Sequence, residues 1–84
     1  MASGEKYDKE AMTAAHNTLP FGTMVKVTNL KNNRSAVVRI NDRYPHGGSK
    51  SKIIEVTSRA AKELGMFKKG KAEVRIEVME AAKQ

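Results

Sequence analysis

The stretch Thr23–Arg43, TMVKVTNLKNNRSAVVRINDR, predicts a β-hairpin at the centre of the fold. Apolar and polar residues alternate over 24–28, which places the two valines of this run on one face of a strand. The segment 29–33 is rich in asparagine, which tolerates left-handed backbone angles and favours a turn. The β-branched run over 35–41 then predicts the returning strand.

Two further strands are predicted after the hairpin. Residues 52–56 are rich in β-branched side chains and follow the flexible, glycine-containing segment 46–49. Residues 72–79 alternate in hydrophobicity, and we expect 79–84 to be a frayed tail. Several short strands separated by turns indicate a mainly β protein, in the form of a small closed or nearly closed β-barrel.

One short helix is predicted between these strands. Thr57 or Ser58 can cap its first turn, and Gly65 can end it. Residues 7–16 fit either a second helix or an irregular loop. We expect a single domain over 1–84, because this length is too short for two independent cores.

Composition excludes several classes of site. The chain has no cysteine, so disulfides, cysteine-based metal sites and thiol nucleophiles are excluded. No apolar run reaches the roughly 18–20 residues of a membrane span, and the polar start predicts no signal peptide or lipobox in this chain. The 16 Lys and Arg against 9 Asp and Glu give a net charge of +7, which favours polyanionic partners. Because these charges are dispersed and not interleaved with aromatic residues, nucleic-acid binding is not expected.

Asp42 is the first candidate for a catalytic group. It lies where the strand over 35–41 gives way to a loop that contains proline and glycine. A carboxylate at such a strand end is held rigidly on one side and is open to substrate on the other, which suits an acid/base group. The alternative is that Asp42 caps a turn or pairs with Arg39 or Arg43.

Neither the histidines nor the glycine-rich loop predicts a cofactor. His16 and His46 have no convincing carboxylate partner at metal-ligand spacing, so we expect no metal site. The segment 47–52, GGSKSK, lacks the spacing of a phosphate-binding loop. A flexible loop is the better interpretation of this segment.

Six short motifs occur in one order along the chain: Ala2–Glu5 (ASGE), Thr13–His16 (TAAH), Thr18–Thr23 (TLPFGT), Val25–Asn29 (VKVTN), Val38–Arg43 (VRINDR) and Ile53–Val56 (IIEV). Together they resemble the double-psi β-barrel domain of the rare lipoprotein A family, which is related to barwin and the expansins. The resemblance extends over about residues 2–79. It implies a six-stranded type of double-psi β-barrel that lacks its usual first strand here, with one or two short helices.

The resemblance also implies a lytic transglycosylase. Such enzymes cleave the β-1,4 bond between N-acetylmuramic acid and N-acetylglucosamine in peptidoglycan and leave a 1,6-anhydro end. The family's polar residues correspond to Glu5, His16 and Asp42 of this sequence. We expect Asp42 to be the acid/base, with Glu5 either as a neighbour that raises its pKa or, in the reverse assignment, as the acid itself. His16 would hydrogen-bond Asp42 or a sugar hydroxyl.

Five further residues are expected to bind the glycan or to shape its cleft: Thr13, Asn41, Arg43, Tyr44 and Glu55. Tyr44 stands where the family usually has glycine, and we place it at the rim of the cleft. Glu55 stands where aspartate is usual, at the floor of the cleft, and its extra methylene would shift the carboxylate by roughly an ångström.

Other functions and a partner remain open at this point. A noncatalytic, expansin-like module would bind cell-wall glycan in the same cleft without cleaving it. A basic barrel that binds a polyanion is the third candidate. The absent first strand would leave a sheet edge unpaired, which favours a dimer through that edge, strand swapping or lower stability. The family context implies the bacterial cell envelope, in the periplasm or at the outer surface.

Overall fold

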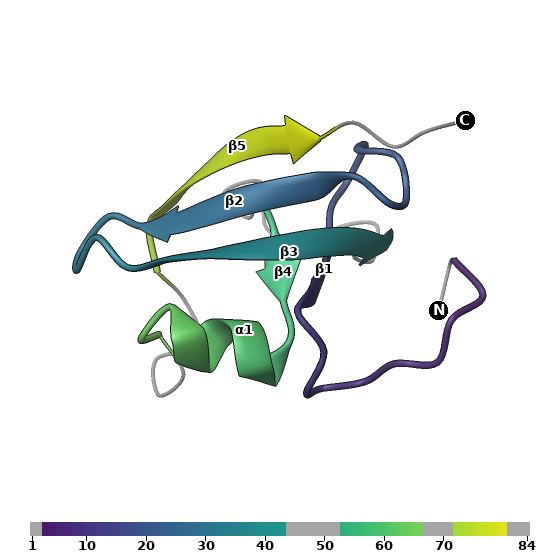
Figure 1. The fold of residues 1–84 in the computed structure, drawn as a ribbon, viewed down its shortest axis with the longest axis horizontal. Helices are drawn as coiled ribbons and strands as arrows, with labels where there is room; N and C mark the ends of the chain where they lie inside the picture. Colours follow the sequence, from purple (N-terminus) through teal and green to yellow (C-terminus); the bar gives the residue numbers. More distant parts are fainter. Residues whose placement is uncertain (1–2, 44–52, 67–71, 81–84) are drawn as a thin grey trace.

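The computed structural model describes residues 3–43, 53–66 and 72–80. Within these ranges the chain forms five strands and one helix (Figure 1): β1 (Thr13–Ala15), β2 (Met24–Asn29), β3 (Ser35–Asp42), β4 (Glu55–Val56), α1 (Ser58–Glu63) and β5 (Val74–Glu80). The prediction of a mainly β protein with a short helix is confirmed.

The five strands form one sheet in the order β4-β1-β3-β2-β5. Strands β2 and β3 are the predicted hairpin and pair antiparallel, with Val25 opposite Val38. Strand β5 pairs antiparallel with β2, whereas β1 runs parallel to β3. Because parallel strands end at the same edge of a sheet, the residues that follow β1 and β3 are brought together. Helix α1 lies to one side of the hairpin and packs on β3 and β4 (Figure 1).

The core lies on the face of the hairpin that the alternation predicted. Val25, Val27, Val38 and Ile40 are completely buried. Leu64, which follows α1, closes the core from the helix side and is also completely buried. Burial of each of these side chains contributes about 1.5–3 kcal/mol to folding, so this small cluster is the main source of stability.

Helix α1 begins and ends where the sequence indicated. The side chain of Thr57 accepts a hydrogen bond from the N–H of Ala60, which makes it the N-cap. Gly65 follows the helix with a φ of +72°, a conformation that glycine adopts without steric cost. The side chains of Asn29 and Asn32 both donate to the carbonyl of Leu64, at 2.9 and 3.1 Å, and so join the hairpin to the end of the helix.

Three boundaries differ from the predictions. Residues 13–15 form strand β1, in a segment for which we expected a helix or an irregular loop, because β3 and β4 supply backbone partners on both sides. Strand β4 covers only 55–56 of the predicted 52–56 in the described chain. Strand β5 includes Met79 and Glu80, which we expected to fray, because Glu80 pairs with Met24 of β2.

Other predictions concern residues that the structure does not describe. The flexible segment 46–49 and the remainder of the expected tail, 81–84, lie outside the described residues. Within the described ranges, no helix is long and apolar enough to cross a membrane.

Candidate active site

The structure brings His16 and Asp42 together at the end of two parallel strands. Asp42 is the last residue of β3, and its register partner in β1 is Ala15, next to His16. A register shift between Ala14 and Ala15 marks an irregularity at this point. The backbone N–H of His16 donates to the carbonyl of Asp42 at 3.1 Å. The two residues therefore share a rigid edge of the sheet.

Asp42 is half-buried, and its carboxylate is held by the backbone of the next residue. Its Oδ1 accepts the N–H of Arg43 at 2.9 Å. Because this N–H belongs to the next residue and not to the one after it, the contact is not the bond that caps an Asx turn. It orients one oxygen of the carboxylate, and Asp42 makes at least one further interaction. This contact is compatible with a role in chemistry, because a fixed carboxylate is what an acid/base group requires.

The imidazole of His16 is held in one tautomer. Its Nδ1 accepts the N–H groups of Thr18 and Leu19, each at 3.0 Å. Since Nδ1 accepts, the proton of the neutral ring is on Nε2, which becomes a hydrogen-bond donor. Burial, together with the nearby charge of Arg43, lowers the pKa of His16 below its usual 6.5. His16 is thus a neutral donor at neutral pH.

Glu5 is bound by Arg39. The two guanidinium nitrogens of Arg39 donate to the two carboxylate oxygens of Glu5, at 2.9 and 2.7 Å. The pKa of Glu5 is lowered to about 2, chiefly by this hydrogen bonding, with smaller contributions from the charge of Arg39 and from Asn41 and Ser3, while desolvation opposes the shift. The ion pair of Glu5 is with Arg39, and the expectation that Glu5 acts as a neighbour of Asp42 stays a prediction.

Asn41 and Arg43 lie beside these groups. Asn41 is buried and hydrogen-bonds the carboxylate of Glu5. The guanidinium Nη1 of Arg43 donates at 3.3 Å to the carbonyls of both His16 and Asp42.

The other residues predicted to contact the glycan are Thr13, Glu55 and Tyr44. Thr13 is buried in β1, and its carbonyl accepts the N–H of Thr57. Glu55 is exposed on β4, where it pairs with Ala15. Tyr44 lies outside the described residues.

Sequence reasoning missed Phe21. Its ring lies under the guanidinium of Arg43, with the Arg43 Cζ atom 4.3 Å from the ring centroid. Phe21 is 37% exposed although it is a large apolar residue. The available signal was an aromatic residue in the turn Pro20-Phe21-Gly22 of the segment that leads from β1 to β2. Nothing local in that segment identifies Arg43 as its partner.

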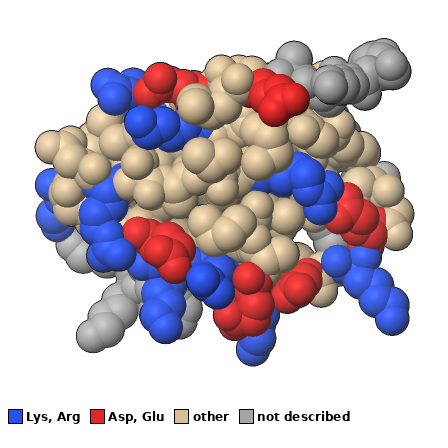
Figure 2. Space-filling model, in the orientation of Figure 1, with Lys and Arg blue, Asp and Glu red and all other residues tan. Residues whose placement is uncertain are grey.

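Charged residues elsewhere on the surface are dispersed. Figure 2 shows acidic and basic side chains interspersed over the visible face, in keeping with the general positive character read from the composition. Within the described ranges, no three His, Asp or Glu side chains are grouped closely enough to hold a metal ion.

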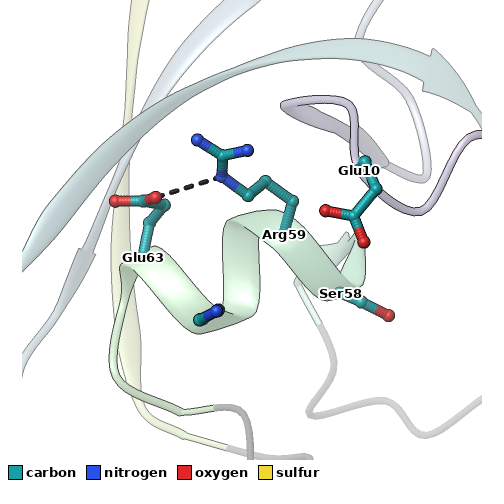
Figure 3. A pocket seen from close by; sticks show the side chains of 5 residues that line it. Glu10, Ser58, Arg59 and Glu63 are labelled. Carbon is teal, nitrogen blue, oxygen red and sulfur yellow. Dashed lines mark hydrogen bonds and ion pairs between the residues drawn. The ribbon is translucent and has the colours of Figure 1, made fainter.

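Two shallow hollows lie away from Asp42. The first, of about 340 Å³, lies over α1 and is lined by Glu10, Ser58, Arg59, Lys62 and Glu63 (Figure 3). Its side chains are exposed, and Arg59 pairs with Glu63 across one helical turn at 3.1 Å. The second, of about 680 Å³, lies between the β2–β3 turn and the residues after α1. The His16–Asp42 edge is the stronger candidate site, because it joins a histidine of lowered pKa to a carboxylate at a strand end.

The chain is similar to named proteins over most of its length. The chain is 55% identical over 78 residues to a protein of Nostoc sp. named "Probable endolytic peptidoglycan transglycosylase RlpA". The matched region is 93% of this chain and 20% of that relative. It is 50% identical over 76 residues to "Endolytic peptidoglycan transglycosylase RlpA" of Neisseria meningitidis serogroup A, covering 90% and 31%. The protein of that name from Haemophilus influenzae is 48% identical over 82 residues, covering 98% and 28%.

The chain spans between a fifth and a third of the length of these relatives. A family described as lytic transglycolase matches residues 1–76, a range that includes Glu5, His16 and Asp42. Since this match covers most of the sequence, the chain belongs to the lytic transglycolase family of double-psi β-barrel domains.

Proposed function

We propose that this domain is a peptidoglycan lytic transglycosylase. It would cleave the β-1,4 bond between N-acetylmuramic acid and N-acetylglucosamine and leave 1,6-anhydro ends. The observation that supports this most directly is the juxtaposition of His16 and Asp42 at the end of β1 and β3, linked by a 3.1 Å backbone hydrogen bond. Relatives whose names describe this activity are about 50% identical over most of the chain.

We propose Asp42 as the acid/base. In its protonated form it would give a proton to the glycosidic oxygen as the C1–O bond breaks, and positive charge develops at C1 of the muramic acid. The resulting carboxylate would then accept the proton of the C6 hydroxyl as the C6 oxygen bonds to C1. One carboxyl group thus gives a proton and recovers one, and the step consumes no water.

The ion pair of Glu5 favours Asp42 over Glu5 in this role. A group with a pKa of about 2 is ionised at neutral pH and has no proton to donate. Glu5 would instead place a fixed negative charge in the site, where it could favour the oxocarbenium-like state. Asn41 and Arg39 hold that charge in position.

His16 would act as a neutral hydrogen-bond donor. With Nδ1 occupied by the N–H groups of Thr18 and Leu19, its Nε2–H is the group available to the Asp42 carboxylate or to a sugar hydroxyl. This role needs no change in the charge of His16 during the reaction.

The wider proposals follow from the same assignment. Glycan strands of peptidoglycan would be the partner, in the bacterial cell envelope, and Thr13, Asn41, Arg43, Tyr44 and Glu55 would bind them or shape the cleft. Thr13 is buried and would act through its neighbours. A dimer through a sheet edge remains a proposal; β4 and β5 are the edge strands of the described sheet.

The test is incubation of the domain with purified sacculi, both intact and stripped of stem peptides by an amidase, followed by mass spectrometry. Soluble products with 1,6-anhydromuramic ends would support the proposal. Binding to the sacculi without release of any soluble product would contradict it and favour the expansin-like, noncatalytic module.

A further inference from the structure

Arg43 joins the two strand ends that hold the candidate site. Its Nη1 lies 3.3 Å from the carbonyl of His16 and 3.3 Å from the carbonyl of Asp42, so one guanidinium spans β1 and β3. Its backbone N–H also donates to the Asp42 carboxylate at 2.9 Å. Both groups of the site are therefore in contact with the same residue.

Phe21 holds the guanidinium of Arg43 from the other side. The 4.3 Å from Arg43 Cζ to the ring centroid is well within the range of a cation–π contact. The ring is itself positioned by its neighbours: the N–H of Gly22 donates to the Ile40 carbonyl at 2.7 Å, and Thr23 bonds the Pro20 carbonyl. The segment between β1 and β2 is thus attached to β3 directly after Phe21, and the bonds from Thr23 to Pro20 close the turn that contains the ring.

We propose that Phe21 is a positioning residue, which acts through Arg43 to fix His16 and Asp42 relative to each other. A long arginine side chain has many rotamers, and an exposed one is free to leave two carbonyls for water. An aromatic face under the guanidinium restricts that freedom without any direct contact with the reacting groups. The proposal rests on the proposed transglycosylase function for its kinetic effect, but its structural part does not.

In this proposal the aromatic ring of Phe21, and not its apolar volume, holds the guanidinium of Arg43. Replacement of Phe21 by leucine keeps an apolar side chain of similar size and removes the π face, whereas tyrosine keeps the face. Tyr7→Leu is the matched control, because Tyr7 is an aromatic residue with 61% exposure. Arg43→Gln removes the guanidinium that Phe21 is proposed to hold.

The kinetic test uses soluble, peptide-free glycan strands and the production of anhydro ends. We expect Phe21→Leu to lower kcat about two- to fivefold, the effect of one partly exposed cation–π contact, with KM within about twofold. Phe21→Tyr should recover the wild-type kcat, and Tyr7→Leu should not change it. The double variant Phe21→Leu with Arg43→Gln should be no slower than Arg43→Gln alone, because the ring acts only through the guanidinium.

A second readout does not depend on activity. The charged groups at the end of β3 beside His16 are Arg43 and Asp42, and Arg43 is one of the causes of the low pKa of His16. Release of the guanidinium should therefore raise the pKa of His16 in Phe21→Leu and in Arg43→Gln, measured by NMR titration, and not in Tyr7→Leu.

The outcomes separate the two proposals. An inactive wild-type domain whose His16 pKa rises in Phe21→Leu would contradict the proposed function and support the positioning role. Multiplicative losses in the double variant, or an unchanged His16 pKa in a folded Phe21→Leu protein, would overturn the positioning role even if the enzyme is active.

Discussion

Arg39 of strand β3 binds both carboxylate oxygens of Glu5, at 2.9 and 2.7 Å, across 34 residues of sequence. This pairing fixes the N-terminal segment to the sheet beside Asn41. It also extends the pH range in which Glu5 carries its charge, because hydrogen bonding to Arg39 is the main cause that lowers the pKa of Glu5 from 4.5 to about 2. These surroundings of Glu5 favour the different roles that we propose for Glu5 and Asp42, although both are carboxylates.

Glu5→Gln should change stability only above a defined pH. The pKa of Glu5 is about 2 in the folded chain and 4.5 without the ion pair, so its stabilising effect is complete above pH 4.5 and is lost as the pH falls toward 2. Urea unfolding of both proteins between pH 2 and 7 should show wild type as the more stable above pH 4.5. The difference should be small, because both side chains are about 40% exposed.

Glu63→Gln provides the comparison for this prediction. It removes an exposed ion pair with Arg59 within α1, far from Arg39 in the sequence. A difference between wild type and Glu5→Gln that stays constant down to pH 2 would contradict the assigned ion pair.

His16 should titrate below pH 6.5 in the folded protein. Burial and the charge of Arg43 both disfavour its protonated form. The unfolded chain then binds a proton at higher pH than the folded chain, so stability is complete above pH 6.5 and decreases as the pH falls below that value. Nitrogen-15 NMR of the imidazole measures the pKa of His16 and shows which ring nitrogen carries the proton. We expect a pKa below 6.5 that rises on unfolding in urea, and Nδ1 without a proton at neutral pH; a proton on Nδ1 would exclude the tautomer described above.

Gly65→Ala should destabilise the junction between α1 and the hairpin. Gly65 has a φ of +72°, and an added Cβ would lie 2.7 Å from the Asn32 side-chain nitrogen that donates to Leu64. The backbone strain and the displaced hydrogen bond should together cost about 2 kcal/mol. Chemical denaturation gives this value directly.

Gly4→Ala separates the cost of backbone strain from the cost of the displaced hydrogen bond. Gly4 also has a positive φ, +83°, but no heavy atom lies within 4 Å of the added Cβ. Its cost should be about 1 kcal/mol, from backbone strain alone. Equal costs for the two substitutions would mean that Asn32 moves aside freely.

The parts of the fold that the sequence predicted are those specified by local interactions. The hairpin of β2 and β3 follows from alternation and from the asparagine-rich turn, where Asn33 adopts a φ of 60°. The ends of α1 follow from a threonine cap and a glycine stop. Strand β1 was not predicted, because three residues are too few for a periodic pattern and its partners lie far along the chain.

The same distinction applies to the site. The position of Asp42 could be predicted, because a strand end next to a turn is visible in the sequence. The partners of Glu5 and Phe21 could not, because Arg39 and Arg43 are two among 16 basic residues and only the folded sheet selects them. Nor does the sequence show that the backbone of Thr18 and Leu19 fixes the tautomer of His16.

The most direct test of the central claim is the rate of anhydro-end formation by Asp42→Asn on peptide-free glycan strands. Asp8→Asn is the matched control, because the Oδ1 of Asp8 likewise accepts a backbone N–H, from Glu10 at 2.9 Å, at an exposed position. We predict a loss of at least about 100-fold for Asp42→Asn with an unchanged unfolding midpoint, and a wild-type rate for Asp8→Asn. A folded Asp42→Asn protein that forms anhydro ends at the wild-type rate would contradict the account.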